Sequence, residues 1–299
     1  MQTISSLSQK TKEQSSTPGS ITAASTVAEP KASNKPKPAR KKKLEWARIL
    51  IRISAVLVAI VLWHLASTYK FNFIINFENI PTPETVWTQF VALLKTDIFY
   101  KHIYISIRRI LIGFSLATFL GVIIGVIMGR FRLMTDIFMP YIEILRPIPA
   151  VAWIPLAILM FPTEESSIIY ITFLGAFFPI VINTIHGVEQ TPAMLVRAAK
   201  SLGASNRAIL WHVVLPGALP SIMAGLAIGM GVSWFSLLAG EIISGQYGIG
   251  YFTWNSYSLV EYPKIIIGML VIGVLGTLST LLVKQASKPF LRWMEKDHS

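Results

Sequence analysis

Few side chains in this sequence could carry out a chemical reaction. The chain has no cysteine, which excludes a disulfide framework, a thiolate metal site and a cysteine nucleophile. It also has no G-x-x-x-x-G-K-S/T loop for phosphates, no H-E-x-x-H zinc motif and no G-x-S-x-G nucleophile elbow. Its histidines pair with no carboxylate at helical spacing within an apolar stretch: His64, His102, His186, His212 and His298. We therefore expect no catalytic residue, no metal site and no directly bound cofactor, so work against a gradient would need energy from a partner.

Several charged residues lie inside or at the edge of apolar stretches, where a charge needs a partner or a route to water, and five of them need separate interpretation. Arg146 is the most expensive, since an arginine at mid-helix in a membrane costs ~2.5 kcal/mol or more. Glu143 lies one turn earlier on the same face and predicts an ion pair, with contact between Arg146 and substrate as the alternative. Glu241 is expected to anchor a helix at the water interface, with a ligand role as the alternative. Arg108 and Arg109 are expected to snorkel to the outer surface.

The composition indicates a membrane protein. Only 14% of the 299 residues are charged, against about 25% in soluble domains, while 53% are hydrophobic and the mean hydropathy is +0.57. This composition argues against a chain that is disordered throughout and against a soluble protein that binds nucleic acid. Six apolar stretches are near or above the ~20 residues that cross a bilayer. They predict an all-α polytopic protein with six transmembrane helices, at roughly 49–67, 106–129, 137–161, 167–187, 213–243 and 264–284.

The positive charges that make up the net charge of +12 indicate how the chain is oriented in the membrane. Residues 1–45 are rich in Ser, Thr, Lys, Pro and Ala without any period, and we expect a disordered basic cytoplasmic tail. Eleven Lys and Arg residues lie at or before the start of the first stretch. Alternate loops from there bring the total on one side to 20 of 27. Because Lys and Arg stay cytoplasmic during insertion, both termini are expected in the cytoplasm, with residues 291–299 as a C-terminal tail.

Small residues recur at four-residue spacing within two of the stretches. They form stripes where another helix backbone can approach closely: Gly121, Gly125 and Gly129 in one, Gly225 and Gly229 in the other. Packing within the chain's own bundle and packing against a second copy of the subunit are the two interpretations.

Prolines interrupt three of the predicted helices. A proline frees the carbonyl four residues back, and in lipid that group must be satisfied by neighbours or line a wet cavity. The prolines are Pro147, Pro149, Pro155, Pro179, Pro216 and Pro220. The clustered breaks indicate a transport pathway, for which the candidate pathway or gate residues are Glu143, Arg146, Pro147, Pro149 and Glu241.

The loop at residues 190–212 predicts two short helices. Thr191 and Pro192 are suited to the N-cap and first position of one helix, Gly203 to a left-handed turn that ends it, and Ser205 to the cap of the next. The first helix has an apolar face made of Met194, Leu195, Ala198, Ala199 and Leu202. Such a helix can lie in a groove of a partner protein. A loop packed against its own bundle is the alternative.

This loop resembles the signature E-A-A-x3-G-x9-I-x-L-P of permeases from binding-protein-dependent ABC importers. The positions in register are Ala198, Ala199, Gly203, Val213, Leu215 and Pro216. Arg197 departs from the signature, which often has Glu there. Segments 81–87, 102–114, 146–156, 212–223 and 248–250 resemble the nitrate/sulfonate/taurine/bicarbonate group of these permeases, and the similarity covers about residues 50–290.

The resemblance implies a type I (MetI-like) permease fold over residues 46–290, in a bacterial cytoplasmic (inner) membrane. It implies two permease copies as a homodimer, two ATPase subunits that bind ATP and Mg²⁺, and an extracytoplasmic solute-binding protein. Sulfonate or taurine is the first candidate substrate, and nitrate or bicarbonate the next. The implied ATPase-coupling residues are Met194, Leu195, Arg197, Ala198, Ala199, Leu202, Gly203, Leu215 and Pro216.

Two other classes of protein also fit six transmembrane helices. A secondary transporter or channel would carry ionisable residues at mid-helix for coupling, and apart from Glu143 and Arg146 the stretches are nearly bare. A polytopic membrane enzyme would need a catalytic pair, which the sequence does not show.

Overall fold

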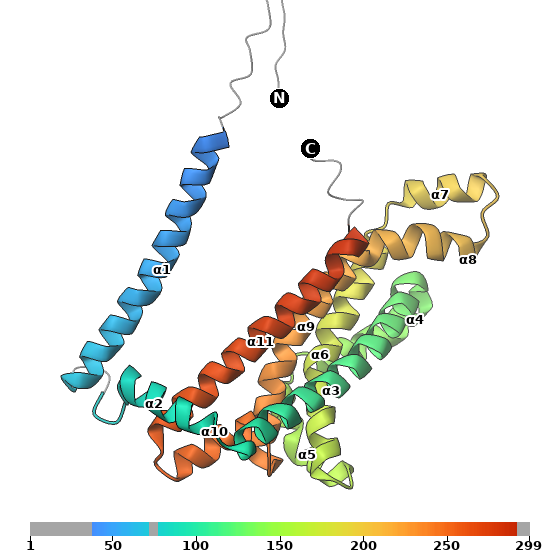
Figure 1. Ribbon diagram of the computed structural model, residues 1–299. Helices are drawn as coiled ribbons and strands as arrows, with labels where there is room; N and C mark the ends of the chain where they lie inside the picture. The colour runs from blue at the N-terminus through green and yellow to red at the C-terminus, as the bar shows by residue number, and fades with distance from the viewer. Residues whose placement is uncertain (1–37, 72–76, 292–299) are drawn as a thin grey trace, which may run out of the picture. The chain divides into compact units, whose positions relative to one another are not determined.

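The computed structural model describes residues 38–71 and 77–291, and these residues form helices without any strand (Figure 1). The predicted tails fall largely outside the described residues, at 1–37 and 292–299. The first helix, α1 (Pro38–Thr68), begins inside the segment expected to be disordered. Proline is favoured at a first helical position, so Pro38 is a suitable start.

The chain divides into two compact units, Met1–Val56 and Leu57–Ser299. The described part of the first unit is the N-terminal portion of α1, whose apolar side chains, such as Leu50 and Ile51, are exposed. The stretch Arg48–Thr68 of α1 is long and apolar enough to cross a membrane. Lipid tails can cover such a surface without any contact to protein.

The second unit holds the other helices. Their bounds are α2 Pro83–Leu93, α3 Asp97–Arg130, α4 Arg132–Leu145, α5 Ile154–Met160, α6 Glu164–Glu189, α7 Ala193–Ser201, α8 Asn206–Ile209, α9 Leu215–Ser244, α10 Ile249–Ser258 and α11 Tyr262–Leu291. A 3-10 turn at Ala150–Trp153 precedes α5. A π-helical turn at Leu210–Val214 joins α8 to α9 without a loop.

The predicted transmembrane helix at 137–161 is wrong as a single helix. Within the described residues, five helices are long and apolar enough to span a membrane. A sixth candidate, counted as one span, is a pair of helices bent by 89° at residues 146–149. The cause is local, since Pro147 and Pro149 have no N–H to donate. Arg146 still has a helical backbone, and the chain becomes extended at Pro149, with φ −57° and ψ 138°. The other five predicted spans are present as α1, α3, α6, α9 and α11.

Helix α6 is the centre of the bundle and packs closely on α3 and α9. Both glycine stripes face it: the α3 glycines approach Ile180, Thr184 and Val188, and the α9 glycines approach Ile180 and Asn183. A Cβ atom added at Gly125 would lie 2.6 Å from Cβ of Thr184. The stripes therefore pack inside the chain, and neither is available to a second copy.

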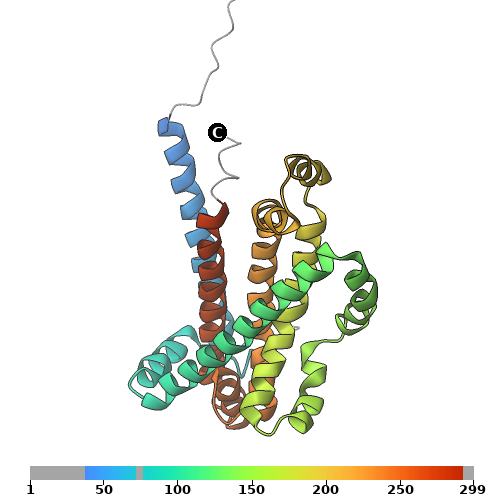
Figure 2. The same cartoon turned by 90° about the vertical axis from the view of Figure 1, so that its right-hand side faces the viewer.

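The two ends of this unit differ. Helices α7 and α8 lie at one end, and α2, α5 and α10 gather at the other (Figures 1 and 2). The long helices α3, α6 and α9 run between the two ends, and their inner faces share a core of Ile110, Ile168, Met230, Trp234 and Leu237. The bundle thus fixes the distance and rotation between the two ends.

The glycine contacts predict a difference between two similar substitutions. Gly125→Ala overpacks the contact between α3 and α6 and should lower the melting temperature by about 2–10 °C. Gly273→Ala is the matched control, because no atom lies within 4 Å of its added Cβ and alanine favours a helix. Thermal unfolding in one detergent measures both variants. Equal melting temperatures would show that the close approach of α3 to α6 does not limit stability.

Candidate functional site

The α7–α8 loop has the helix–glycine–helix geometry that its sequence predicts. Gly203 has φ +84°, in the left-handed region that ends α7, and its N–H donates to the carbonyl of Lys200 at 2.9 Å. Ser205 caps α8 and accepts a hydrogen bond from the N–H of Ala208 at 3.3 Å. The predicted cap at Thr191 is wrong, because α7 begins at Ala193 and the Thr191 hydroxyl instead donates to the carbonyl of Gly187 at 3.4 Å.

The apolar residues of this loop divide into two sets. Ala199 and Val196 pack against a cluster that includes Ile209 and Val214, which holds the loop to the start of α9. The larger side chains point outward, with exposed fractions of 79% for Met194, 54% for Leu195 and 88% for Leu202. Arg197 and Ala198 are exposed beside them, while Leu215 and Pro216 are half-buried in the first turn of α9.

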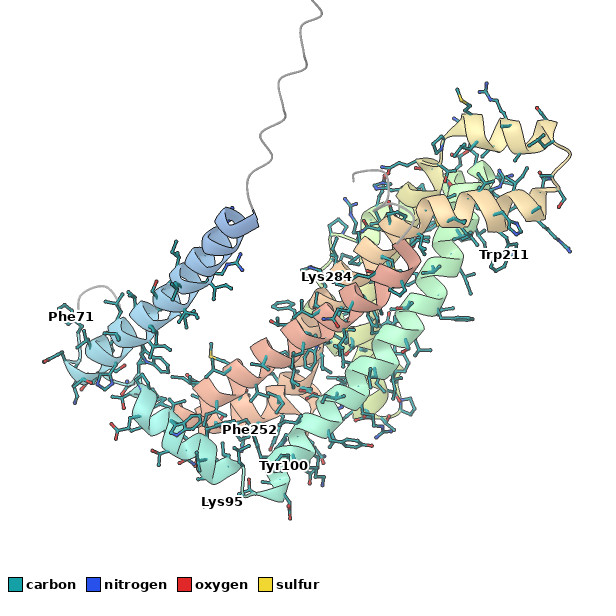
Figure 3. The ribbon with its side chains drawn as sticks, turned by 45° about the horizontal axis from the view of Figure 1, so that its top comes forward. Phe71, Lys95, Tyr100, Trp211, Phe252 and Lys284 are labelled. Atoms are coloured by element: carbon teal, nitrogen blue, oxygen red, sulfur yellow. The ribbon has the colours of Figure 1, made fainter. Side chains whose placement is uncertain are left out.

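Trp211 belongs to the same surface, although sequence reasoning did not select it. Its side chain is 67% exposed, and Figure 3 shows it at this end of the molecule, with Tyr100 at the other end. The signal in the sequence was a large aromatic residue that follows the apolar face of the preceding helix. This end of the bundle therefore presents four large apolar side chains that are more than half exposed, Met194, Leu195, Leu202 and Trp211.

A second feature is a pocket of about 330 Å³ beside the break between α4 and α5. Arg146 caps the C-terminus of α4 and lines this pocket, together with Pro149, Trp153 and residues of α6 and α9. The predicted ion pair is absent: among the described residues Arg146 and Glu143 form none, and both side chains are exposed. The reason is that the Arg146 side chain borders the pocket rather than following α4 back toward Glu143.

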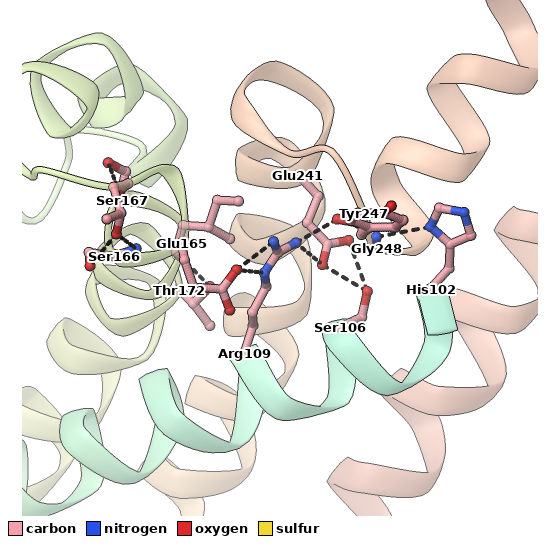
Figure 4. A network of polar contacts seen from close by, with 12 residues as sticks. His102, Ser106, Arg109, Glu165, Ser166, Ser167, Thr172, Glu241, Tyr247 and Gly248 are labelled. Atoms are coloured by element: carbon pink, nitrogen blue, oxygen red, sulfur yellow. Dashed lines mark hydrogen bonds and ion pairs between the residues drawn. The ribbon is translucent and has the colours of Figure 1, made fainter. Parts of the chain in front are cut away.

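A third feature is a buried polar network at the opposite end from the α7–α8 loop (Figure 4). The guanidinium of Arg109 on α3 donates to Glu165 on α6 from Nε at 2.9 Å and from Nη2 at 2.6 Å. Its Nη1 donates to Glu241 on α9 at 3.1 Å and to the carbonyl of Tyr247 at 2.6 Å. Only 6% of the Arg109 side chain and 1% of the Glu241 side chain are exposed. The expectations that Arg109 snorkels to the surface and that Glu241 anchors a helix at the water interface are therefore wrong.

The same network positions the start of α10. Three consecutive backbone N–H groups find side-chain acceptors on neighbouring helices: Gly248 on His102 Nδ1 at 3.1 Å, Ile249 on Ser106 Oγ at 2.9 Å and Gly250 on Glu241 Oε2 at 2.9 Å. The Ser106 hydroxyl in turn donates to Glu241 Oε1 at 2.8 Å. Because His102 Nδ1 accepts a hydrogen bond, it carries no proton. The first amides of α10, which have no partner within their own helix, are thus satisfied.

The sequence did contain a signal for this network. His102, Ser106 and Arg109 follow one another at spacings of four and three residues, which places them on one face of α3. Their acceptor and donor partners come from distant segments and could not be assigned from spacing. Within residues 38–71 and 77–291, no group of His, Asp and Glu side chains is arranged to hold a metal ion. The network holds backbone amides and carboxylates in fixed positions, and both the Ser106 hydroxyl and the Glu241 carboxylate are taken up by these hydrogen bonds.

The network predicts that neighbouring arginines of α3 differ sharply in their effect on stability. Arg109→Gln leaves Glu241 buried without its cation and should lower the free energy of unfolding by about 3–5 kcal/mol. Arg108→Gln changes an exposed side chain and should alter it by less than about 0.5 kcal/mol. Thermal unfolding of the two variants in one detergent compares them directly. Similar stability of both variants would mean that the buried pairing contributes little.

Comparison with known proteins identifies the chain's relatives. Residues 117–294 match the family described as binding-protein-dependent transport system inner membrane component. The nitrate import permease of Synechocystis sp. is 32% identical over 75% of this chain and 82% of its own. In Escherichia coli, a putative aliphatic sulfonates transport permease is 36% identical over 80% of this chain and 90% of its own. The taurine transport system permease of the same organism is 29% identical over 85% of this chain and 94% of its own.

The matched region begins within α3 and includes the α4–α5 break, the α7–α8 loop and α9, while His102, Ser106 and Arg109 precede it. With several helices long and apolar enough to span a membrane, the chain is a multi-pass protein of the inner membrane with a MetI-like helical fold. The chain belongs to the binding-protein-dependent transport family, as the permease subunit of an ABC importer.

Proposed function

We propose that the chain forms the translocation pathway of an importer for a small oxyanion, with sulfonate or taurine as the first candidate and nitrate or bicarbonate as the next. The relatives named for sulfonate, taurine and nitrate transport support this class of substrate. Arg146 supports it as well, because a cation beside a pocket favours an anion by simple charge attraction.

The observation that carries the proposal is the surface of the α7–α8 loop. Met194, Leu195, Leu202 and Trp211 expose apolar surface at the end of a chain that has no phosphate-binding loop of its own. Exposed apolar side chains on short helices fit a groove of a partner protein. We propose that this partner is the ATPase and that residues 191–212 couple ATP-driven closure to movement of the membrane helices.

The proposed assembly places this loop in the cytoplasm, with both termini on the same side, as the distribution of Lys and Arg supports. Two copies of the chain would form a homodimer, and two ATPase subunits would bind ATP and Mg²⁺, so that no cofactor binds the permease directly. An extracytoplasmic solute-binding protein would deliver substrate at the opposite end, where the Arg109 network and α10 lie.

The turn at Gly203 provides a test of coupling. Nothing lies within 4 Å of a Cβ added at Gly203, so a substitution there acts through the backbone and not through a clash. Gly203→Val strains a φ of +84° and should abolish stimulation of ATP hydrolysis by the binding protein, together with uptake. Gly203→Asn is the matched control, because asparagine tolerates left-handed backbone, and should retain most of both activities. Full coupling in the valine variant would contradict the role of this loop.

Docking of the ATPase can be tested separately from coupling. Leu202→Glu places a charge on the most exposed apolar side chain of the loop and should reduce co-purification of the ATPase by about tenfold or more. The control is Leu259→Glu, the same change on a side chain that is 61% exposed next to α10, at the other end. Pull-down of the ATPase with the tagged permease measures both. Equal recovery with both variants would argue against docking at the α7–α8 loop.

A further inference from the structure

The pocket beside Arg146 lies at mid-membrane depth. Its lining residues on α6 fall between Leu174 and Asn183, near the middle of a helix that runs from Glu164 to Glu189. Its lining residues on α9, Ile228 and Val232, lie near the middle of Leu215–Ser244. Since both helices are apolar enough to cross the bilayer, their midpoints lie near its centre. The break between α4 and α5 brings Arg146 to this same level.

Arg146 lacks the compensation that the other arginine inside the bundle has. Arg109 is held by two carboxylates, Glu165 and Glu241. Arg146, in the described part of the chain, has neither an ion pair nor a side-chain hydrogen bond, and the residues that line its pocket include no carboxylate. A guanidinium at this depth is stable only beside water or an anion. The described residues supply no counter-ion for Arg146, so its charge is free to attract water or an anion from outside the chain.

The other residues that line the pocket offer both polar and apolar contacts to a bound anion. Asn183 donates from Nδ2 to the carbonyl of Pro179 at 2.8 Å, which fixes its amide beside the pocket. The indole N–H of Trp153 is buried and has no acceptor among the described residues. Phe178 and Ile228 supply apolar wall. The volume of about 330 Å³ is at the small end for ligand sites, which suits a compact solute.

We propose that this pocket is the intramembrane binding site for the transported oxyanion, with Arg146 as its charged contact. An alkanesulfonate fits it best, because its sulfonate head would pair with the guanidinium and its short carbon body would lie against the aromatic and aliphatic wall. This inference rests on the proposed function, since it assumes that the importer carries a small oxyanion. It adds a specific binding site, in which one part of the pocket contacts the charged head of the ligand and another part contacts its apolar body.

The test uses the complete transporter, with its ATPase and binding protein, in liposomes. Uptake of ethanesulfonate, taurine and nitrate is measured beside ATP hydrolysis stimulated by the binding protein. Arg146→Gln should lower uptake of the transported probe by about 10- to 100-fold while stimulated ATP hydrolysis persists. Arg146→Lys should restore part of the uptake, because it keeps the charge but not the planar fork. Arg108→Gln, on an exposed side chain of α3, should transport as the wild type does.

A second variant tests the apolar wall without touching the charge. Ile228→Trp fills part of the pocket and should lower uptake of ethanesulfonate more than uptake of nitrate, which has no carbon body. It also keeps the proposal testable if Arg146→Gln fails to assemble with the ATPase. Uptake by an assembled Arg146→Gln transporter within about twofold of wild type, less than the loss of one charged hydrogen bond, would overturn the site, as would an Ile228→Trp transporter that carries both probes normally. If the wild-type transporter carries none of the three probes, the proposed substrate class itself is wrong.

Discussion

The pairing of the Arg109 guanidinium is the interaction on which the end of the bundle opposite the α7–α8 loop depends. The guanidinium lies between carboxylates from two other helices, Glu165 on α6 and Glu241 on α9, and it also donates a hydrogen bond to the carbonyl of Tyr247. A charge buried in a membrane bundle is stable only when paired, so these helices cannot separate at this end without exposing it. Glu241 then extends the constraint to α10 through the N–H of Gly250. One side chain thus sets the relative positions of four elements.

Close backbone contact holds the helices together in the middle of the bundle, as the charge pairing of Arg109 does at its end. Lipid tails are as apolar as a leucine side chain, so burial alone does not drive membrane helices together, and packing with short-range contacts must hold them. The glycine faces of α3 and α9 let both helices approach α6 closely, and both meet Ile180. In contrast, only 11% of the apolar stretch of α11 is buried within the protein. The protein therefore combines a tightly packed centre of three helices with more loosely packed outer helices.

Features set by local sequence could be predicted, and features set by distant partners could not. The five continuous membrane helices, the turn at Gly203 and the cap at Ser205 each follow from a short run of residues. The burial and pairing of Arg109 and Glu241 depend on a contact between residues 132 positions apart in the chain, which the spacing of residues does not reveal. The bend of 89° at residues 146–149 is an intermediate case. The prolines predict a break in the helix. Only the fold shows that Arg146 borders a pocket at this break and does not pair with Glu143.

The π-helical turn at Leu210–Val214 fixes the rotation of α9 relative to the α7–α8 loop. No irregular segment separates α8 from α9, and the N–H of Leu215 donates to the carbonyl of Leu210, five residues back. A turn of this kind holds one residue more than an α-helical turn. Adding or deleting one residue there would rotate α9 by about 100° and carry Gly225 and Gly229 off α6. The chain length between the loop and the glycine face is therefore as constrained as the residue types, and single-residue insertions should be far rarer there than substitutions.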